Sequence, residues 1–231
     1  MRTLLPSALL ACLSISTCAS APGHSAAIEL NPERLEAVNT RVELVEYRGH
    51  RALQLLPLPG VEDSNEVMLA ILNDLQFEDG TIEVELAGAP RPDAGPEMRG
   101  FIGIAFRVQA RDGRWDCFYL RPTNGRADDQ LRRNHSLQYV SAPDYGWKRL
   151  RTEHPGMYES YADLVAGEWT RVKIRVSGPK AMLYVNGASQ PSLVVNDLKS
   201  GVRSGAIALW SHPSTEGYFS NLRVSSSPGE P

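Results

Sequence analysis

Strict alternation of apolar and polar residues is the feature that most constrains this chain. The stretch TIEVELA places Ile82, Val84 and Leu86 on one face of a strand, and Glu83 and Glu85 on the other. The stretch TRVKIRV repeats the pattern. A period of two is that of an extended strand with one solvated face, and no sustained helical period accompanies it. The sequence therefore predicts an all-β body.

Turn residues separate the predicted strands. EDG at 78–80, RDG at 111–113, SGPK at 177–180 and NG at 186–187 each supply a glycine where a positive φ is needed. The stretch RVELVEYRGHRALQLL, within residues 28–65, has the pattern of one more hairpin. We therefore expect antiparallel hairpins, and we expect residues 28–65 to complete a sandwich.

The N-terminal segment, residues 1–27, differs from the rest of the chain. One arginine, a short apolar segment and a run of small residues follow in the order of a secretory signal. Cleavage after Ala19, Ala21 or Ala27 fits the small residues, and a lipid anchor on Cys18 is an alternative suggested by the preceding Ile-Ser-Thr. We expect an exported protein that is periplasmic, extracellular or lipid-anchored to the cell envelope.

The positions of the cysteines indicate that the fold is stabilised by its hydrophobic core and not by disulfide bonds. Cys12 and Cys18 lie in the expected leader, so Cys117 is the cysteine left to the mature chain. An internal disulfide framework is thereby excluded, even in an oxidising compartment. We expect Cys117 to be a small buried hydrophobe on a strand.

The length and net charge of the chain limit the number of domains and the kinds of partner that we expect. A sandwich of this size is commonly one domain, so we expect a single domain over 28–225 and a frayed tail over 226–231. The net charge of -3 offers no surface for a polyanion, which argues against nucleic acid as a partner. No apolar run after the leader approaches the roughly 20 residues of a spanning helix, so no transmembrane segment is expected in the mature chain.

Two predicted strands have a second face made of small residues. In FIGIAFRV this face carries a glycine and an alanine before Arg107, and in GAIALW it carries two alanines before Trp210. Small side chains leave room above a sheet for a ligand. The alternative is that another layer or the long segment 124–168 packs there. That segment is rich in aromatic residues, which predicts a packed excursion.

Several stretches, taken in order, resemble a known superfamily. They are FEDGTIEVEL, GFIGIAFRV, WDCFYLRPTNG, GEWTRVKIRVSGPKAMLYVNG, SGAIALW and GYFSNLRV, and they cover roughly residues 66–225. The chain resembles the concanavalin A-like lectin/glucanase superfamily, particularly exported bacterial domains of the laminin-G type and of the 3-keto-disaccharide hydrolase family. The resemblance implies a jelly-roll sandwich of two antiparallel sheets, with a concave face on which relatives bind glycans.

The same resemblance implies where a catalytic carboxylate would lie. Retaining glucanases of the superfamily carry three alternating acidic residues on one strand, and Glu83 and Glu85 match two of them. Hydrolysis requires two carboxylates that flank the scissile bond. The third acidic residue of the glucanase pattern is missing from this strand. In the keto-disaccharide hydrolase relatives, an acidic strand corresponds best to RWDCFYL, which makes Asp116 the candidate catalytic residue.

The RDG turn decides which side chains share the small-residue face. A three-residue loop with a bulge places Tyr119 and Arg121 on the face of Arg107. The same register sends Phe118 and Leu120 to the core. A two-residue turn inverts this arrangement, and we prefer the first because burying an unpaired charge is costly.

The predicted sugar-binding surface combines planar donors and acceptors with aromatic platforms, the usual make-up of a ligand site. The predicted ligand-binding residues are Arg107, Tyr119, Arg121, Asn124, Arg126, His135, Gln138, Tyr139, Trp147, Trp210 and His212.

Purely structural roles are the alternative for several of these residues. The loop arginines and aspartates can pair with each other, His212 can belong to a turn, and Trp169 can be a core anchor. A metal site at Asp128, Asp129 and His135 is weak, because calcium takes about six to eight oxygen ligands and no loop has EF-hand spacing. We predict no cofactor and no metal ligands, with calcium as the metal to consider.

Three functions follow from these residues. The first is an exported carbohydrate-binding domain that recognises a glycan or glycoside on its concave face. The second is a glycoside or 3-keto-glycoside hydrolase, which requires two carboxylates, or one and a metal, converging in the concavity. The third is a laminin-G-like protein-interaction module, in which the long segment plugs the concave face.

Overall fold

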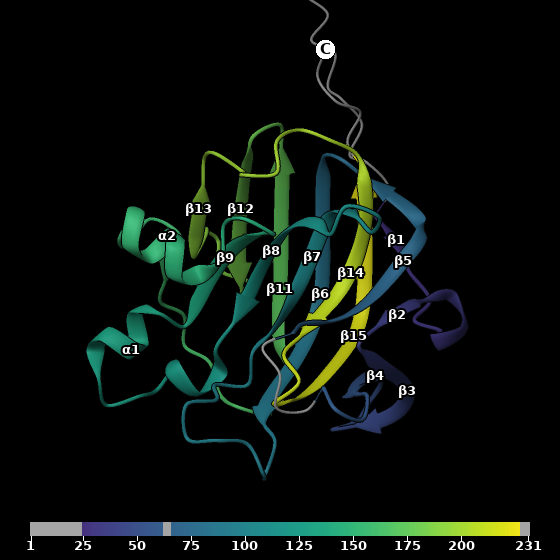
Figure 1. Cartoon of the computed structure of the whole chain (residues 1–231), viewed down its shortest axis with the longest axis horizontal. Helices are drawn as coiled ribbons and strands as arrows, with labels where there is room; N and C mark the ends of the chain where they lie inside the picture. The colour runs from purple at the N-terminus through teal and green to yellow at the C-terminus, as the bar shows by residue number, and fades with distance from the viewer. Residues whose placement is uncertain (1–24, 62–65, 227–231) are drawn as a thin grey trace, which may run out of the picture.

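The computed structural model describes residues 25–61 and 66–226, which form two antiparallel sheets packed face to face (Figure 1). The eight-stranded sheet has the order β13-β12-β11-β6-β15-β4-β3, with β1 paired to β15. The seven-stranded sheet has the order β10-β9-β8-β7-β14-β5-β2. The all-β body predicted from the alternation is confirmed, and so is the jelly-roll sandwich that the resemblance implied.

The bounds of the elements are as follows. The eight-stranded sheet contains β1 (Ala26–Ala27), β3 (Thr40–Tyr47), β4 (His50–Pro57), β6 (Gly80–Pro90), β11 (Thr170–Ser177), β12 (Lys180–Val185), β13 (Leu193–Val195) and β15 (Thr215–Ser226). The seven-stranded sheet contains β2 (Glu36–Val38), β5 (Met68–Phe77), β7 (Ile102–Gln109), β8 (Arg114–Leu120), β9 (Leu137–Ala142), β10 (Glu159–Ser160) and β14 (Gly205–Ser211). The helices are η1 (Pro32–Arg34), η2 (Pro122–Asn124), α1 (Gln130–Asn134) and α2 (Trp147–Glu153).

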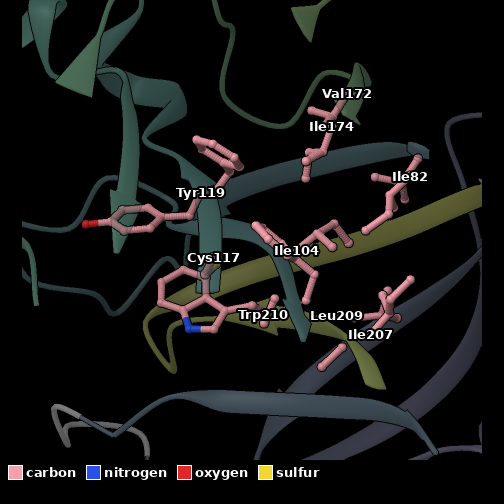
Figure 2. Close-up of a cluster of buried hydrophobic side chains, with 14 of the residues drawn as sticks. Ile82, Ile104, Cys117, Tyr119, Val172, Ile174, Ile207, Leu209 and Trp210 are labelled. Carbon is pink, nitrogen blue, oxygen red and sulfur yellow. The ribbon is translucent and has the colours of Figure 1, made fainter. Parts of the chain in front are cut away.

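The core lies between the sheets and is built by the alternation. Ile82 of β6 and Ile174 of β11 are fully buried on one side, and Ile104 of β7 and Leu209 of β14 are fully buried on the other (Figure 2). Because period two sends every second side chain outward, the charged residues of β6 and β11 lie on the outer face of the eight-stranded sheet. The predicted amphipathic strands are thus confirmed.

The SGPK and RDG turns connect hairpins, β11–β12 and β7–β8, as predicted, but the hairpin expected at EDG is wrong because this turn joins β5 of one sheet to β6 of the other. Gly80, at the start of β6, has a φ of 138°, and a Cβ there would lie 2.0 Å from the carbonyl oxygen of Ser225. A glycine is therefore required at this turn. The N-terminal hairpin is also confirmed, because β3 pairs with β4 at the edge of the eight-stranded sheet.

The RDG turn differs from the expected three-residue loop. Gln109 pairs with Arg114, so four residues, 110–113, connect β7 to β8. The predicted register of β8 holds, because Phe118 pairs with Ile104 on the core face and both are buried. Tyr119 and Arg121 consequently lie on the outer side of the sheet.

Arg107 is where the register prediction is wrong. The pairing of β7 shifts between Phe106 and Gln109, which marks a β-bulge, and Arg107 has a φ of 53° within it. Its side chain is fully buried and does not reach the face of Tyr119. It donates to the carbonyl oxygens of residues 78, 178 and 201, at 3.0, 2.8 and 3.0 Å, and to Asp79 Oδ1 at 2.9 Å. Arg107 therefore ties three turns together at one end of the sandwich.

The ends of the chain bear on the domain boundaries. The expected leader lies mostly outside the described residues, and so do Cys12, Cys18 and residues 227–231 of the expected tail. Ala26 and Ala27 form β1 on β15, so cleavage after Ala19 or Ala21 keeps this strand and cleavage after Ala27 removes it. Cys117 is buried as expected, and burial raises the pKa of its thiol well above the ordinary value.

The segment 124–168 packs as predicted. It contributes α1, α2 and the strands β9 and β10, which extend one edge of the seven-stranded sheet. In the described part of the chain, no helix combines the length and apolar character needed to cross a membrane.

Candidate functional site

An aromatic row crosses the outer face of the seven-stranded sheet. Trp210 of β14 and Tyr119 of β8 both lie opposite Gly103 of β7, and their rings stack at 4.8 Å between centroids. Tyr119 is followed by Phe101 at 6.1 Å and Phe101 by His212 at 5.4 Å. We call Trp210, Tyr119, Phe101 and His212 the aromatic row.

Gly103 makes the stacking in this row fit. A Cβ at this position would lie 2.7 Å from the Cα and Cβ of Tyr119, closer than real side chains approach. The small-residue face seen in the sequence is therefore filled by the two large rings. Tyr119 is 3% exposed and Trp210 is 5% exposed, so the expectation of an open hollow here is wrong. The indole Nε1 of Trp210 is buried and has no hydrogen-bond partner among the described residues.

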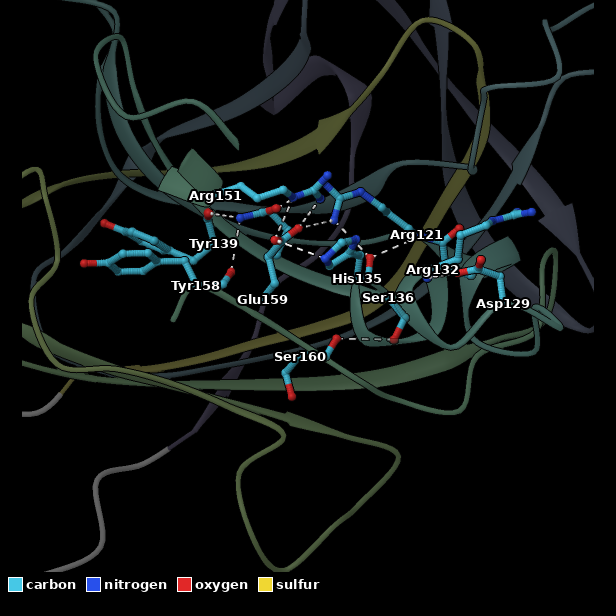
Figure 3. Close-up of polar contacts among 12 residues, drawn as sticks. Arg121, Asp129, Arg132, His135, Ser136, Tyr139, Arg151, Tyr158, Glu159 and Ser160 are labelled. Atoms are coloured by element: carbon cyan, nitrogen blue, oxygen red, sulfur yellow. Dashed lines mark hydrogen bonds and ion pairs between the residues drawn. The ribbon is translucent and has the colours of Figure 1, made fainter. Parts of the chain in front are cut away.

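A polar cluster adjoins this row, and its centre is Glu159 on β10 (Figure 3). Arg121, which follows β8, donates through Nη1 to Glu159 Oε1 at 3.2 Å. Through Nη2 it donates to the Tyr119 hydroxyl at 2.8 Å and to Gln138 Oε1 at 3.0 Å. Arg151 of α2 donates through Nε to Glu159 Oε2 at 2.8 Å and through Nη2 to Oε1.

His135 completes the cluster from the end of α1. Its Nε2 lies 3.6 Å from Glu159 Oε2. Burial lowers the pKa of His135, and the attraction of Glu159 opposes this, while Arg151 and Arg121 add to the lowering. We call Glu159, Arg121, Arg151, His135 and Gln138 the Glu159 cluster. Burial also raises the pKa of Tyr119 to about 12, so its hydroxyl keeps its proton at neutral pH.

The accessible part of the site is a rim formed by Trp147 and Arg151 of α2 and by His135, which follows α1. Trp147 is 40% exposed, and the guanidinium of Arg151 lies over its ring at 4.8 Å. The side chain of Arg151 is 33% exposed, whereas those of Arg121 and Glu159 are almost fully buried. The rim therefore presents a partly exposed indole ring with a guanidinium lying over it, and the carboxylate of Glu159 holds that guanidinium in place.

Asp116, the predicted catalytic residue, points away from this cluster. It pairs with Phe106 and shares the core side of β8, fully buried. Its Oδ1 accepts from the Tyr139 hydroxyl at 2.5 Å, and its Oδ2 accepts from the Ser200 hydroxyl. The prediction that Asp116 lies in the sugar-binding concavity is wrong, because the two faces of a strand alternate and Asp116 belongs to the inner one.

Three predicted binding residues lie elsewhere. Tyr139 is fully buried beside Asp116, and burial raises the pKa of its hydroxyl. Asn124 is buried, and its amide donates to the carbonyl oxygen of His135 at 3.3 Å. Arg126 is exposed and forms a paired contact with Asp163, at 2.7 and 2.9 Å. These contacts are structural. The binding surface predicted from the sequence is therefore reduced to the Glu159 cluster, the aromatic row and the rim.

Sequence reasoning missed Glu159, Arg151 and Phe101. Glu159 lies on a strand of two residues, and Arg151 on a helix of seven, so neither belongs to a long periodic pattern. The only signal for Glu159 and Arg151 was the density of polar and aromatic residues in 124–168, whereas Phe101 was placed on the second face of FIGIAFRV but not counted among the binding residues. Within the described residues, no three His, Cys, Asp or Glu side chains gather as a metal site would require.

The chain is similar to several solved structures. The carbohydrate-binding module CBM66 from Bacillus subtilis matches with a TM-score of 0.57 and 13% identity over 83% of this chain and 96% of that one. A protein of unknown function with a galectin-like fold from Bacillus subtilis matches with a TM-score of 0.56 and 12% identity, over 89% of this chain and 98% of that one. A native glycosidic hydrolase matches with a TM-score of 0.54 and 11% identity, over 92% of this chain and 100% of that one.

These likenesses show a jelly-roll fold. No protein-family model matches the chain, and no curated protein is similar to it. Membership of the laminin-G or 3-keto-disaccharide hydrolase group stays a prediction.

Proposed function

We propose that this protein is a carbohydrate-binding domain whose ligand docks on the rim formed by Trp147, Arg151 and His135. The observation that carries the proposal is the Glu159 cluster itself. Its carboxylate is almost fully buried on an outer sheet face and fixes a partly exposed guanidinium over a partly exposed indole ring. Sugars are recognised by fixed polar groups and by aromatic faces that pack on their C–H surfaces, which is what this rim offers.

Two further considerations support the proposal. Solved structures with the same jelly-roll fold include a carbohydrate-binding module. The expected N-terminal signal would deliver the domain to the periplasm, the exterior or a lipid anchor on the envelope, where polysaccharides are encountered.

The number of carboxylates at the site favours binding over hydrolysis. The Glu159 cluster holds one carboxylate, and both of its oxygens accept from guanidinium groups. Glycoside hydrolysis needs two carboxyl groups that flank the scissile bond, about 5 to 9.5 Å apart. Asp116 cannot serve as the second, because it lies on the core side of the sheet.

The test is a glycan array followed by titration calorimetry with the best ligand. Trp147→Ala removes the exposed ring, and we expect about tenfold weaker binding or more, since that ring is the platform of the rim. Glu159→Gln frees Arg151 and should weaken binding as well. Arg149→Ala is the matched control, because Arg149 lies on the same helix but pairs with Glu153 at 2.9 Å.

The outcomes separate cleanly. Unchanged affinity in Trp147→Ala, or an equal loss in Arg149→Ala, would refute the rim as the docking surface. Release of a reducing sugar by the wild-type protein during the titration would replace binding with hydrolysis as its function.

A further inference from the structure

A groove lies on the opposite side of the molecule, on the outer face of the eight-stranded sheet. Its volume is about 330 Å³, and it is lined by side chains from β6, β11, β12 and β15. These four strands are neighbours in the sheet (Figure 1). Its principal lining residues are Glu83, Glu85, Arg171, Lys173, Tyr184 and Arg223. None of these belongs to the aromatic row or to the Glu159 cluster.

The groove is lined by charges that do not pair with each other. Lys173 and Arg223 both lie directly opposite Glu83 in the register, and Arg171 lies opposite Glu85. Opposite charges at such positions commonly form ion pairs. Yet within the described residues, Arg171, Lys173 and Arg223 have no carboxylate within 4.0 Å.

Glu85 is engaged by other partners. Its Oε2 accepts from the Asn221 side-chain amide at 2.5 Å and lies 3.0 Å from His50 Nδ1. Asn221 sits in a bulge of β15 with a φ of 54°, which turns its side chain onto β6. The groove therefore carries three cations, Arg171, Lys173 and Arg223, against two carboxylates, Glu83 and Glu85, which leaves an excess of one positive charge.

Aromatic rings lie beside the groove, next to the start of β11. Trp169 directly precedes β11, and its ring stacks on His50, whose Nδ1 lies 3.0 Å from the groove residue Glu85. Trp169 was expected in the core, but it is half-buried, stacked on His50 at 4.9 Å and close to Tyr47 at 5.7 Å. Its indole Nε1 is buried without a partner among the described residues. Tyr47 in turn stacks on Tyr218 at 3.7 Å.

We infer that this groove is a second ligand site, which binds an acidic saccharide. A sugar carboxylate neutralises the excess positive charge of Arg171, Lys173 and Arg223, and a guanidinium recognises a carboxylate through two parallel hydrogen bonds. The C–H face of a neighbouring sugar unit packs on the exposed part of the Trp169 ring, and Glu83 accepts from sugar hydroxyls. A neutral saccharide leaves the three cations unpaired, so the site discriminates by charge.

The probe is tetragalacturonate, with its fully methyl-esterified form as the control, because the two differ in charge while keeping the same sugar chain. We expect the wild-type protein to bind the acid at least about tenfold more tightly than the ester, and the difference to shrink at high salt. Arg171→Gln and Lys173→Gln should each weaken binding of the acid by about tenfold.

Arg175→Gln is the matched control, since Arg175 lies on the same strand and the same face and changes the net charge equally, but does not line the groove. Equal weakening by Arg175→Gln, equal binding of acid and ester, or absence of binding would each overturn the inference. Trp147→Ala should leave tetragalacturonate binding unchanged. A loss in that variant alone would assign the acid to the Glu159 rim instead.

Discussion

At the scale of single residues, Arg107 is a cation enclosed by the ends of three turns. Four hydrogen bonds satisfy it, and Asp79 balances its charge. Removing one partner of a buried pair leaves the other charge uncompensated, so Arg107→Met should lower the free energy of unfolding by about 3–5 kcal/mol. Denaturant unfolding measures this. Arg111→Met, in the exposed β7–β8 turn, should change it by less than about 0.5 kcal/mol. Similar losses in both variants would contradict the role given to Arg107.

Two histidines give stability a pH dependence. Burial lowers the pKa of His212 below its ordinary value of 6.5, and burial is also the largest cause of the lowered pKa of His135. The unfolded chain then binds more protons than the folded one once the pH falls toward 6.5 and below, so acidification destabilises the fold. His212→Asn keeps an acceptor for Ser214 and removes the titration. It should flatten the loss of stability between about pH 7 and 5, as followed by thermal unfolding. An unaltered slope would argue against this assignment.

At the scale of elements, β1 tests where the folded domain begins. Ala26 and Ala27 pair with Val224 and Arg223 at the end of β15, and Arg223 donates to Ser25. A chain that begins at Ile28 loses these contacts and should be less stable by about 1 kcal/mol than one that begins at Pro22, because exposed backbone hydrogen bonds contribute modestly. Paired melting curves measure the difference. Identical curves would mean that β1 adds nothing to the fold.

Elements also explain what could be predicted from the sequence. β6 and β11 are long and alternate strictly, and their turns contain glycine, so local pattern alone places them. Arg107 follows the same alternation, but the bulge that redirects it depends on pairing with both β8 and β14. β10 is two residues long and exists only through its pairing with β9. Glu159 therefore could not be placed before the tertiary structure was known.

At the scale of the whole molecule, the two outer faces of the sandwich carry different chemistry. One has a buried polar cluster with a small exposed rim, and the other has an open groove with unpaired charges. Ligands bound at the two faces are separated by the hydrophobic core, so their affinities should be independent. Titration of the array ligand with and without saturating tetragalacturonate should give the same affinity within about twofold. A shift of tenfold or more would mean that the two faces are coupled.

The proposal that the Glu159 rim binds sugar has a direct test in the NMR spectrum of the isotopically labelled protein. Addition of the best ligand from the glycan array should shift the indole resonance of Trp147 and the resonances of Arg151 and His135 first. Residues of β6 and β11 should move little. Shifts confined to the eight-stranded sheet, with Trp147 unmoved, would contradict the account.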